Sequence, residues 1–268
     1  MYFRLYVDII PRLTVAPLYD NLFLEVKMIK KAFTLAELLI TLGIIGVVAA
    51  ITLPSLIVQY QDKVLATKTK RAYSLIQQAI QKSQSESGTV DDVTSLFDTN
   101  KSSIEVLENF GKYFNVVKIC RSASECPNEN YVILYSYPLY LGNGKATAGS
   151  LKYPYLVLAD GTFISIIQYG ACIRESSAVA FNPDGTAKKD DNGNVIYNTF
   201  QEKYCADLRF DVNGKALPNQ YGRDAFEIRY SADGKISGWS ATGFDNLIKI
   251  LRGEDVVYTK YKFGDAKK

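Results

Sequence analysis

The sequence contains no histidine, which excludes Ser-His and Cys-His nucleophile pairs and every histidine metal site. It also lacks a G-x-S-x-G nucleophile motif and any C-x-x-C pair. The formal net charge is +3, too small by itself to indicate nucleic acid binding. Much ordinary hydrolase chemistry is therefore excluded, although a composition of 47% hydrophobic and 22% charged residues is that of a globular protein.

One segment, Phe33–Val58, is almost devoid of charge and contains a single ionisable side chain, Glu37. As a helix it would span ~39 Å, more than the ~30 Å of a hydrocarbon core. The segment therefore predicts a membrane-spanning helix, and it is too long for the apolar region of a cleavable signal peptide. The lysines directly before it favour a cytoplasmic amino end.

The helical pattern continues beyond the membrane segment, because apolar residues recur at spacings of three, four and seven from Val64 to Ile80. Gly88 is a natural stop, so one helix is predicted to reach Ser87. The predicted parts are a membrane stem (33–58), an amphipathic stem (59–87) and an exported head (88–268).

The residues Lys30–Ile40, which read KKAFTLAELLI, resemble the class III signal of the type IV pilin and type II secretion pseudopilin family. The resemblance implies cleavage by a prepilin peptidase between Ala32 and Phe33, and N-methylation of Phe33. Residues 1–32 would then be the leader. Because leaders in this family are usually short, Met28 is the favoured start, which leaves residues 1–27 as an extension or an artefact.

Two residues of the predicted stem have expected roles in assembly. An unpaired carboxylate in hydrocarbon costs ~3 kcal/mol, so Glu37 is predicted to pair with the new α-amine of a neighbouring subunit and set the axial register. The alternative is that Glu37 lies at the membrane edge and reaches water. Pro54 removes one backbone hydrogen bond and is predicted to bend the helix.

After Gly88 the pattern changes to short β-branched and aromatic runs separated by turn dipeptides such as Asp160-Gly161. The predicted fold is α+β, an antiparallel sheet packed on the amphipathic half of the stem helix. The predicted strands are Tyr113–Ile119, Tyr131–Tyr140, Tyr155–Ala159, Thr162–Tyr169, Ala206–Val212 and Phe226–Ser231.

All four cysteines, Cys120, Cys126, Cys172 and Cys205, lie in the predicted head. An even number in an exported domain indicates disulfides. Three pairings are possible, and Cys120 with Cys126 and Cys172 with Cys205 is the favoured one. A zinc site made by four thiolates is the alternative, but the spacing is poor for it.

A stretch rich in oxygen ligands offers a possible calcium site, since calcium takes six to eight oxygens from such loops. No glutamate closes an EF-hand, and Asx-rich turns between strands are the preferred interpretation. The candidate ligands are Asp207, Asp211, Asn213, Asn219 and Asp224.

The predicted function is that of a structural subunit of a type IV pilus-like filament, without enzymatic activity. Expected partners are other pilin subunits, the prepilin peptidase, the membrane and the inner-membrane assembly platform, while nucleic acid binding is left open. The head would be exported from a single-pass inner-membrane precursor and end in a periplasmic or extracellular filament. The alternatives are a type II secretion pseudopilin and a membrane-tethered periplasmic enzyme or sensor.

Overall fold

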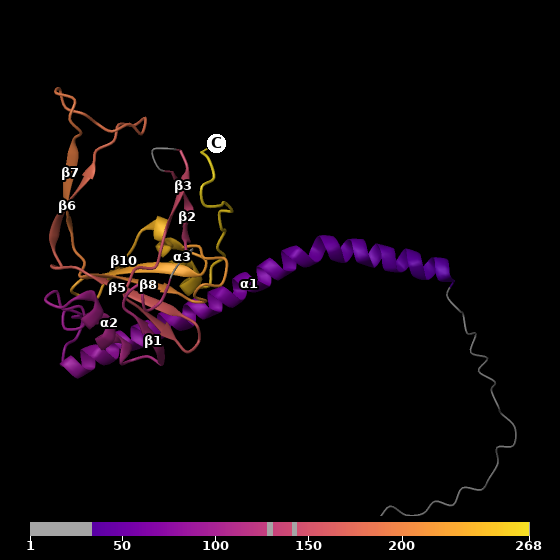
Figure 1. Ribbon diagram of the computed structural model, residues 1–268, viewed down its shortest axis with the longest axis horizontal. Coiled ribbons are helices and arrows are strands. Elements are labelled where there is room, and N and C mark those ends of the chain that lie inside the picture. Colours follow the sequence, from indigo (N-terminus) through magenta and orange to yellow (C-terminus); the bar gives the residue numbers. More distant parts are fainter. Residues whose placement is uncertain (1–33, 128–130, 141–143, 268) are drawn as a thin grey trace, which may run out of the picture. The chain divides into compact units, whose positions relative to one another are not determined.

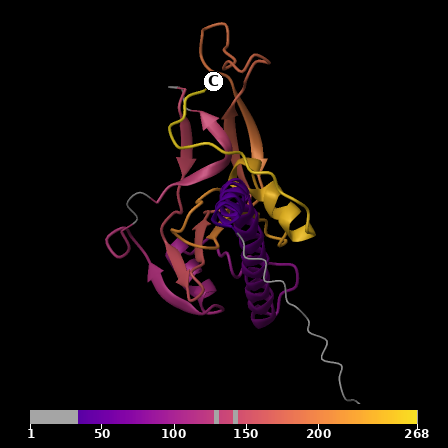
Figure 2. The same ribbon diagram turned by 90° about the vertical axis from the view of Figure 1, so that its right-hand side faces the viewer.

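The computed structural model describes residues 34–127, 131–140 and 144–267 (Figures 1 and 2). The predicted leader (1–32) and the predicted processing residues Ala32 and Phe33 lie outside these ranges. By its internal contacts the chain forms two units, Met1–Leu53 and Pro54–Lys268.

The described part of the first unit consists almost entirely of the beginning of helix α1 (Leu35–Ser87). Its large apolar residues are exposed; for example, Leu35 is 74% exposed and Ile51 is 72% exposed. The helix is long and apolar enough to cross a membrane. None of the most apolar part of the helix is buried within the chain, so lipid or other helices are needed to cover it.

Within the second unit, α1 turns one face toward a hydrophobic core. The buried residues recur at helical spacing and are Leu65, Thr69, Ala72, Ile76, Ala79, Ile80 and Ser83. The helix ends at Ser87, and Gly88 follows with a φ of 66°. The predicted single helix through Ser87 is thus confirmed, as is the α+β fold.

The main sheet has six strands, and every neighbouring pair is antiparallel. In spatial order its strands are β1 (Val116–Cys120), β4 (Tyr155–Leu158), β5 (Phe163–Gln168), β8 (Ala206–Asp211), β9 (Ala225–Tyr230) and β10 (Ile236–Ser237). The turn at Asp160-Gly161 joins β4 to β5 as predicted.

Two further antiparallel hairpins are separate from this sheet. One pairs β2 (Ile133–Tyr140) with β3 (Ala146–Gly149), and the other pairs β6 (Arg174–Val179) with β7 (Tyr197–Glu202). The prediction of a strand at β2 is correct, but its partner is β3 and not the main sheet.

The side chains of β8 alternate between two environments, as the pleat requires. Leu208 and Phe210 belong to the core cluster that includes α1, whereas Asp207, Arg209 and Asp211 point to the opposite face. Figure 1 shows α2 on the same side of the sheet as α1, with both hairpins and the C-terminal segment on the other side.

Two short helices complete the fold, and the sequence analysis predicted neither. Helix α2 (Ser103–Gly111) begins with a capping box in which Ser102 and Glu105 bond each other's backbone N–H groups. Helix α3 (Phe244–Arg252) follows a 3-10 turn, η1 (Ser240–Thr242). The S-x-x-E pattern before an apolar run was a usable signal for α2.

Candidate functional site

At the start of α1, Glu37 forms a capping box with Thr34. The Thr34 N–H and Oγ1 donate to Glu37 Oε2 at 2.9 and 3.0 Å, and the Glu37 N–H donates to Thr34 Oγ1 at 3.2 Å. Local hydrogen bonds therefore engage one carboxylate oxygen of Glu37, an arrangement that was not predicted from the sequence. Phe33, which would carry the partner amine, lies outside the described residues.

Pro54 lies inside α1, and the helix continues without interruption on both sides of it. The boundary between the two contact units falls between Leu53 and this proline. A proline costs the helix one backbone hydrogen bond at this point. The predicted bend stays a prediction.

The cysteines form two disulfides, in the pairing that the sequence favoured. Cys120, the last residue of β1, bonds Cys126, with a Cα–Cα distance of 5.5 Å. Cys172 bonds Cys205 with a Cα–Cα distance of 4.0 Å. The second bond closes the base of the arm, residues 172–205, which contains β6 and β7.

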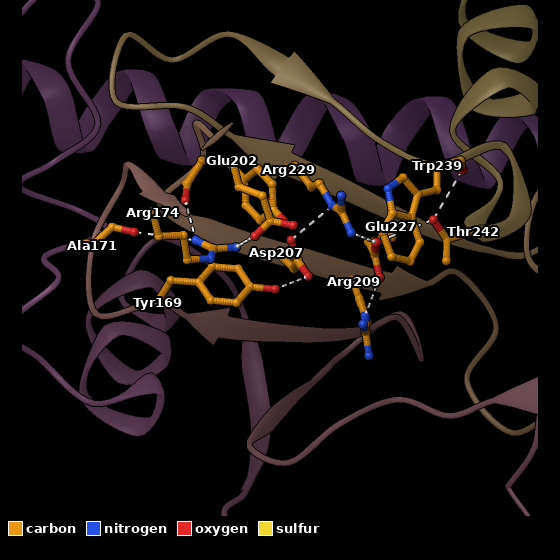
Figure 3. A network of polar contacts seen from close by, with 11 residues as sticks. Tyr169, Ala171, Arg174, Glu202, Asp207, Arg209, Glu227, Arg229, Trp239 and Thr242 are labelled. Atoms are coloured by element: carbon orange, nitrogen blue, oxygen red, sulfur yellow. Dashed lines mark hydrogen bonds and ion pairs between the residues drawn. The ribbon is translucent and has the colours of Figure 1, made fainter. Parts of the chain in front are cut away.

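The sheet face opposite α1 carries a chain of stacked cations and aromatic rings beside the arm (Figure 3). The Arg174 guanidinium lies 3.6 Å from the centroid of the Tyr169 ring and 4.4 Å from that of Tyr204. Arg229 lies 4.6 Å from the Tyr204 ring and 4.0 Å from that of Trp239. Such contacts strengthen when they are shielded from water.

Three carboxylates balance the three arginines of this face. Arg174 pairs with Glu202 at 2.7 Å, and Arg209 pairs with Glu227 at 2.7 Å. Arg229 contacts both Asp207 and Glu227, at 3.4 and 3.6 Å. The Arg174–Glu202 pair lies within the arm, and stacking of Arg174 on Tyr169, whose hydroxyl donates to Asp207 of β8, joins the arm's base to the sheet.

The five candidate calcium ligands do not share one location. Asp207 accepts a hydrogen bond from the Tyr169 hydroxyl at 2.6 Å and belongs to the arginine network. Asp211 lies four residues further along β8, about 13 Å away on an extended strand. The described residues contain no group of three or more His, Cys, Asp or Glu side chains that could hold a metal ion. Calcium binding stays a prediction.

Asp211 and Asp224 are neighbouring carboxylates with no exposed surface. Asp211 accepts from the Tyr131 hydroxyl at 2.7 Å and from the Asn213 N–H at 3.0 Å. Asp224 accepts from the N–H groups of Asn219 and Gln220, at 2.8 and 2.7 Å. The Asp211–Asn213 bond forms an Asx-type turn, as the preferred sequence interpretation expects, whereas Asp224 bonds N–H groups four and five residues before it and so closes the loop on itself.

Burial raises the pKa values of both carboxyls. It raises the pKa of Asp211 well above its usual range, and the charge of Asp224 adds to this effect. Burial also raises the pKa of Asp224 to about 6, although the two backbone N–H groups that bond it act in the opposite direction. The pair is therefore a titratable element inside the head.

The buried carboxylates fix the junction loop, residues 212–224, which contacts several elements distant in sequence. Arg223 pairs with Asp62 of α1 at 2.8 Å, and the Gln220 amide donates to the Thr259 carbonyl at 2.9 Å. The loop also exchanges backbone hydrogen bonds with Leu134 of β2. It thus joins the stem helix, a hairpin and the C-terminal segment.

Comparison with known proteins gives one match, to the prokaryotic N-terminal methylation motif over residues 27–53. The chain carries a class III signal. This motif is characteristic of type IV pilins and pseudopilins, and the match supports a pilin-like or pseudopilin-like protein. Neither the curated proteins nor the solved structures contain a match to the chain.

The class III signal implies processing by prepilin peptidase and polymerisation with pilins, and it suggests a structural subunit. It covers the beginning of α1, where Glu37 lies, and none of the head. The signal and the apolar helix together fit an inner-membrane anchor for an exported head.

Proposed function

We propose that this pilin-like chain is a structural subunit of a type IV pilus-like filament, assembled through α1 after removal of the leader. The precursor crosses the inner membrane once, with the amino end in the cytoplasm and the head exported. The observation that carries the proposal is Glu37, the single ionisable side chain between Leu35 and Val58.

The capping box satisfies the hydrogen bonds of Glu37 but does not neutralise it. A helix amino end contributes roughly half a positive charge, which leaves a net negative charge in an apolar segment. The α-amine created by cleavage before Phe33 is a cation of suitable chemistry. When subunits pack, pairing that amine with a neighbour's Glu37 penalises every axial offset that separates the two groups.

The apolar surface of α1 supports the same proposal. Packing of apolar helices in a membrane-like environment is weakly directional, because lipid tails and leucine side chains are equally apolar. The exposed side chains can therefore supply contact area, while the carboxylate supplies the register. Filament assembly needs both.

The test compares Glu37→Ala, Glu37→Gln and a matched control, Thr34→Ala, in cells that assemble the filament. Glutamine still serves as the acceptor of a capping box, so Glu37→Gln isolates the charge from the cap. Thr34→Ala removes the cap, at a cost of about 1 kcal/mol to the helix start, and keeps the carboxylate. Each membrane fraction is analysed by mass spectrometry, and surface filaments are counted.

We expect every variant to be inserted and to mature with an N-methylated Phe33. Insertion of Glu37→Ala should be easier by ~3 kcal/mol, so a loss of filaments must arise during packing. Thr34→Ala should assemble normally, Glu37→Gln should be intermediate at best, and Glu37→Ala should fail. Normal filament yield from Glu37→Ala would show that the carboxylate has no part in assembly.

A further inference from the structure

The C-terminal strap, residues 259–267, runs along hairpin β2–β3 on the side of the sheet away from α2 (Figures 1 and 2). It is held at several points. The Ala146 N–H donates to the Asp265 carbonyl at 2.8 Å, and the Lys267 N–H donates to the Gly144 carbonyl at 2.8 Å. The Tyr261 hydroxyl donates to the Tyr135 carbonyl at 2.6 Å. The strap is therefore a preformed surface.

Between the strap and β2 lies a groove of about 820 Å³. Pro138 and Tyr140 of β2 form one wall, and residues of the strap, including Lys260 and Lys267, form the other. Tyr140 is 37% exposed. Phe263, one residue beyond Lys262 on the strap, is 64% exposed.

The charge around this groove differs from that of the whole chain, which is nearly neutral. Lys260 and Lys267 line it, Lys262 lies between them in the strap, and Lys145 pairs through its backbone with the groove residue Ala266. Asp265 is the one acidic residue that lines the groove in the described chain, and its Oδ2 accepts the Lys262 N–H.

The strap lysines are available to a ligand. Among the described residues, no ion pair involves Lys260, Lys262 or Lys267. Cations without internal partners attract an anion without first breaking a salt bridge, and a polyanion releases its own counterions on binding them.

We propose that this groove binds single-stranded nucleic acid, with the strap lysines on phosphates and the Tyr140 ring against a base. A charged groove beside accessible aromatic rings is the combination that holds unpaired bases without sequence preference. An acidic polysaccharide would use the lysines alone, because it offers no flat base for the ring. The proposal is independent of the chain's place in a filament.

The test measures fluorescence anisotropy of a labelled oligo(dT) with the full mature chain in detergent. The oligonucleotide is about 20 nucleotides long, which exceeds the ~4–16 nucleotides that one single-strand-binding OB fold covers. The charge variant is Lys260→Gln with Lys267→Gln. Its matched control is Lys188→Gln with Lys189→Gln, an exposed lysine pair in the arm that makes no ion pair among the described residues. The ring variant is Tyr140→Ala, and melting curves confirm that each variant is folded.

We expect the wild type and the arm control to bind oligo(dT) equally. The groove charge variant should bind at least about tenfold more weakly, and the slope of log affinity against log salt should fall by about 2. Tyr140→Ala should weaken binding by about 5- to 100-fold without changing that slope.

Three results would overturn the inference. Absence of oligo(dT) binding at low salt would remove the site. Binding of dextran sulfate as tight as that of oligo(dT), with both ligands indifferent to Tyr140→Ala, would replace nucleic acid by an acidic polysaccharide as the ligand. Equal losses in the arm control would show that only overall charge matters.

Discussion

The buried carboxyls Asp211 and Asp224 should make the head more stable at mildly acidic pH than at neutral pH. A carboxyl whose pKa is higher in the folded state binds its proton more tightly there. Its contribution to the stability of the fold is therefore complete below the pKa of the unfolded state, and it is lost as the pH rises through the pKa of the folded state. For Asp224 the values are 3.8 and about 6.

The pKa difference of Asp224 corresponds to about 3 kcal/mol between strongly acidic and neutral pH. About half of this, roughly 1.4 kcal/mol, should be regained on lowering the pH from about 7.5 to about 5. For a unit of this size, that gain raises the melting temperature by about 3 to 6 °C. Below this range, exposed carboxyls such as Asp233, whose pKa is lowered to about 2, begin to contribute with the opposite sign.

The assay is thermal unfolding of the detergent-solubilised chain in EDTA at several pH values. The informative variant is Asp211→Asn, because an asparagine can still bond Tyr131 and the Asn213 N–H while its charge is gone. It should flatten the pH profile, because the raised pKa of the Asp211 carboxyl then no longer contributes. The matched control is Asp191→Asn on the exposed arm, which should retain the wild-type slope. Parallel profiles for wild type and Asp211→Asn would refute the reasoning.

Three further outcomes are expected. Replacing Cys172 and Cys205 by serine should lower the free energy of unfolding by ~3–4 kcal/mol by the loop-entropy relation, and loss of the Cys120–Cys126 bond should lower it by roughly 2 kcal/mol. Chemical denaturation can measure both losses. Gly243→Ala should lower the melting temperature strongly, because φ is 83° and the new Cβ would lie 2.2 Å from a backbone nitrogen of the junction loop. A chelator should leave the melting temperature unchanged at neutral pH if the loop is only a set of Asx turns; a calcium-dependent rise would support the metal hypothesis.

The long helix could be predicted from the helical repeat of its apolar residues, and six strands from short β-branched and aromatic runs between turn dipeptides. The face of α1 from Leu65 to Ser83 follows the helical repeat, and strands such as β8 and β9 alternate between core and opposite face. Strands β6 and β7 could not be found in this way. Their sequences, RESSAV and YNTFQE, are polar and largely exposed, because the arm packs on nothing but itself over most of its length.

The disulfide pairing and the candidate ligands show a different limit of sequence reasoning. The favoured pairing is the one that the structure contains, and in it each bond joins a cysteine to the next cysteine along the chain. For Asp207 and Asp211, the predicted strand already implied a separation of about 13 Å, which is incompatible with one metal ion. Their actual partners, Tyr169 and Tyr131, come from distant segments that no local pattern identifies.

The junction loop connects these observations physically. The buried part of the loop, around Gln220 and Asp224, must satisfy its polar backbone, and here Asp224 bonds the N–H groups of Asn219 and Gln220. The bonded loop then presents Arg223 to Asp62 of α1 and the Gln220 amide to the first residue of the C-terminal strap. Asp224 is therefore connected through Gln220 to Thr259, the residue at which the strap begins. A loss of oligo(dT) binding in Asp211→Asn, without any change at the groove lysines, would show that this connection matters to the groove.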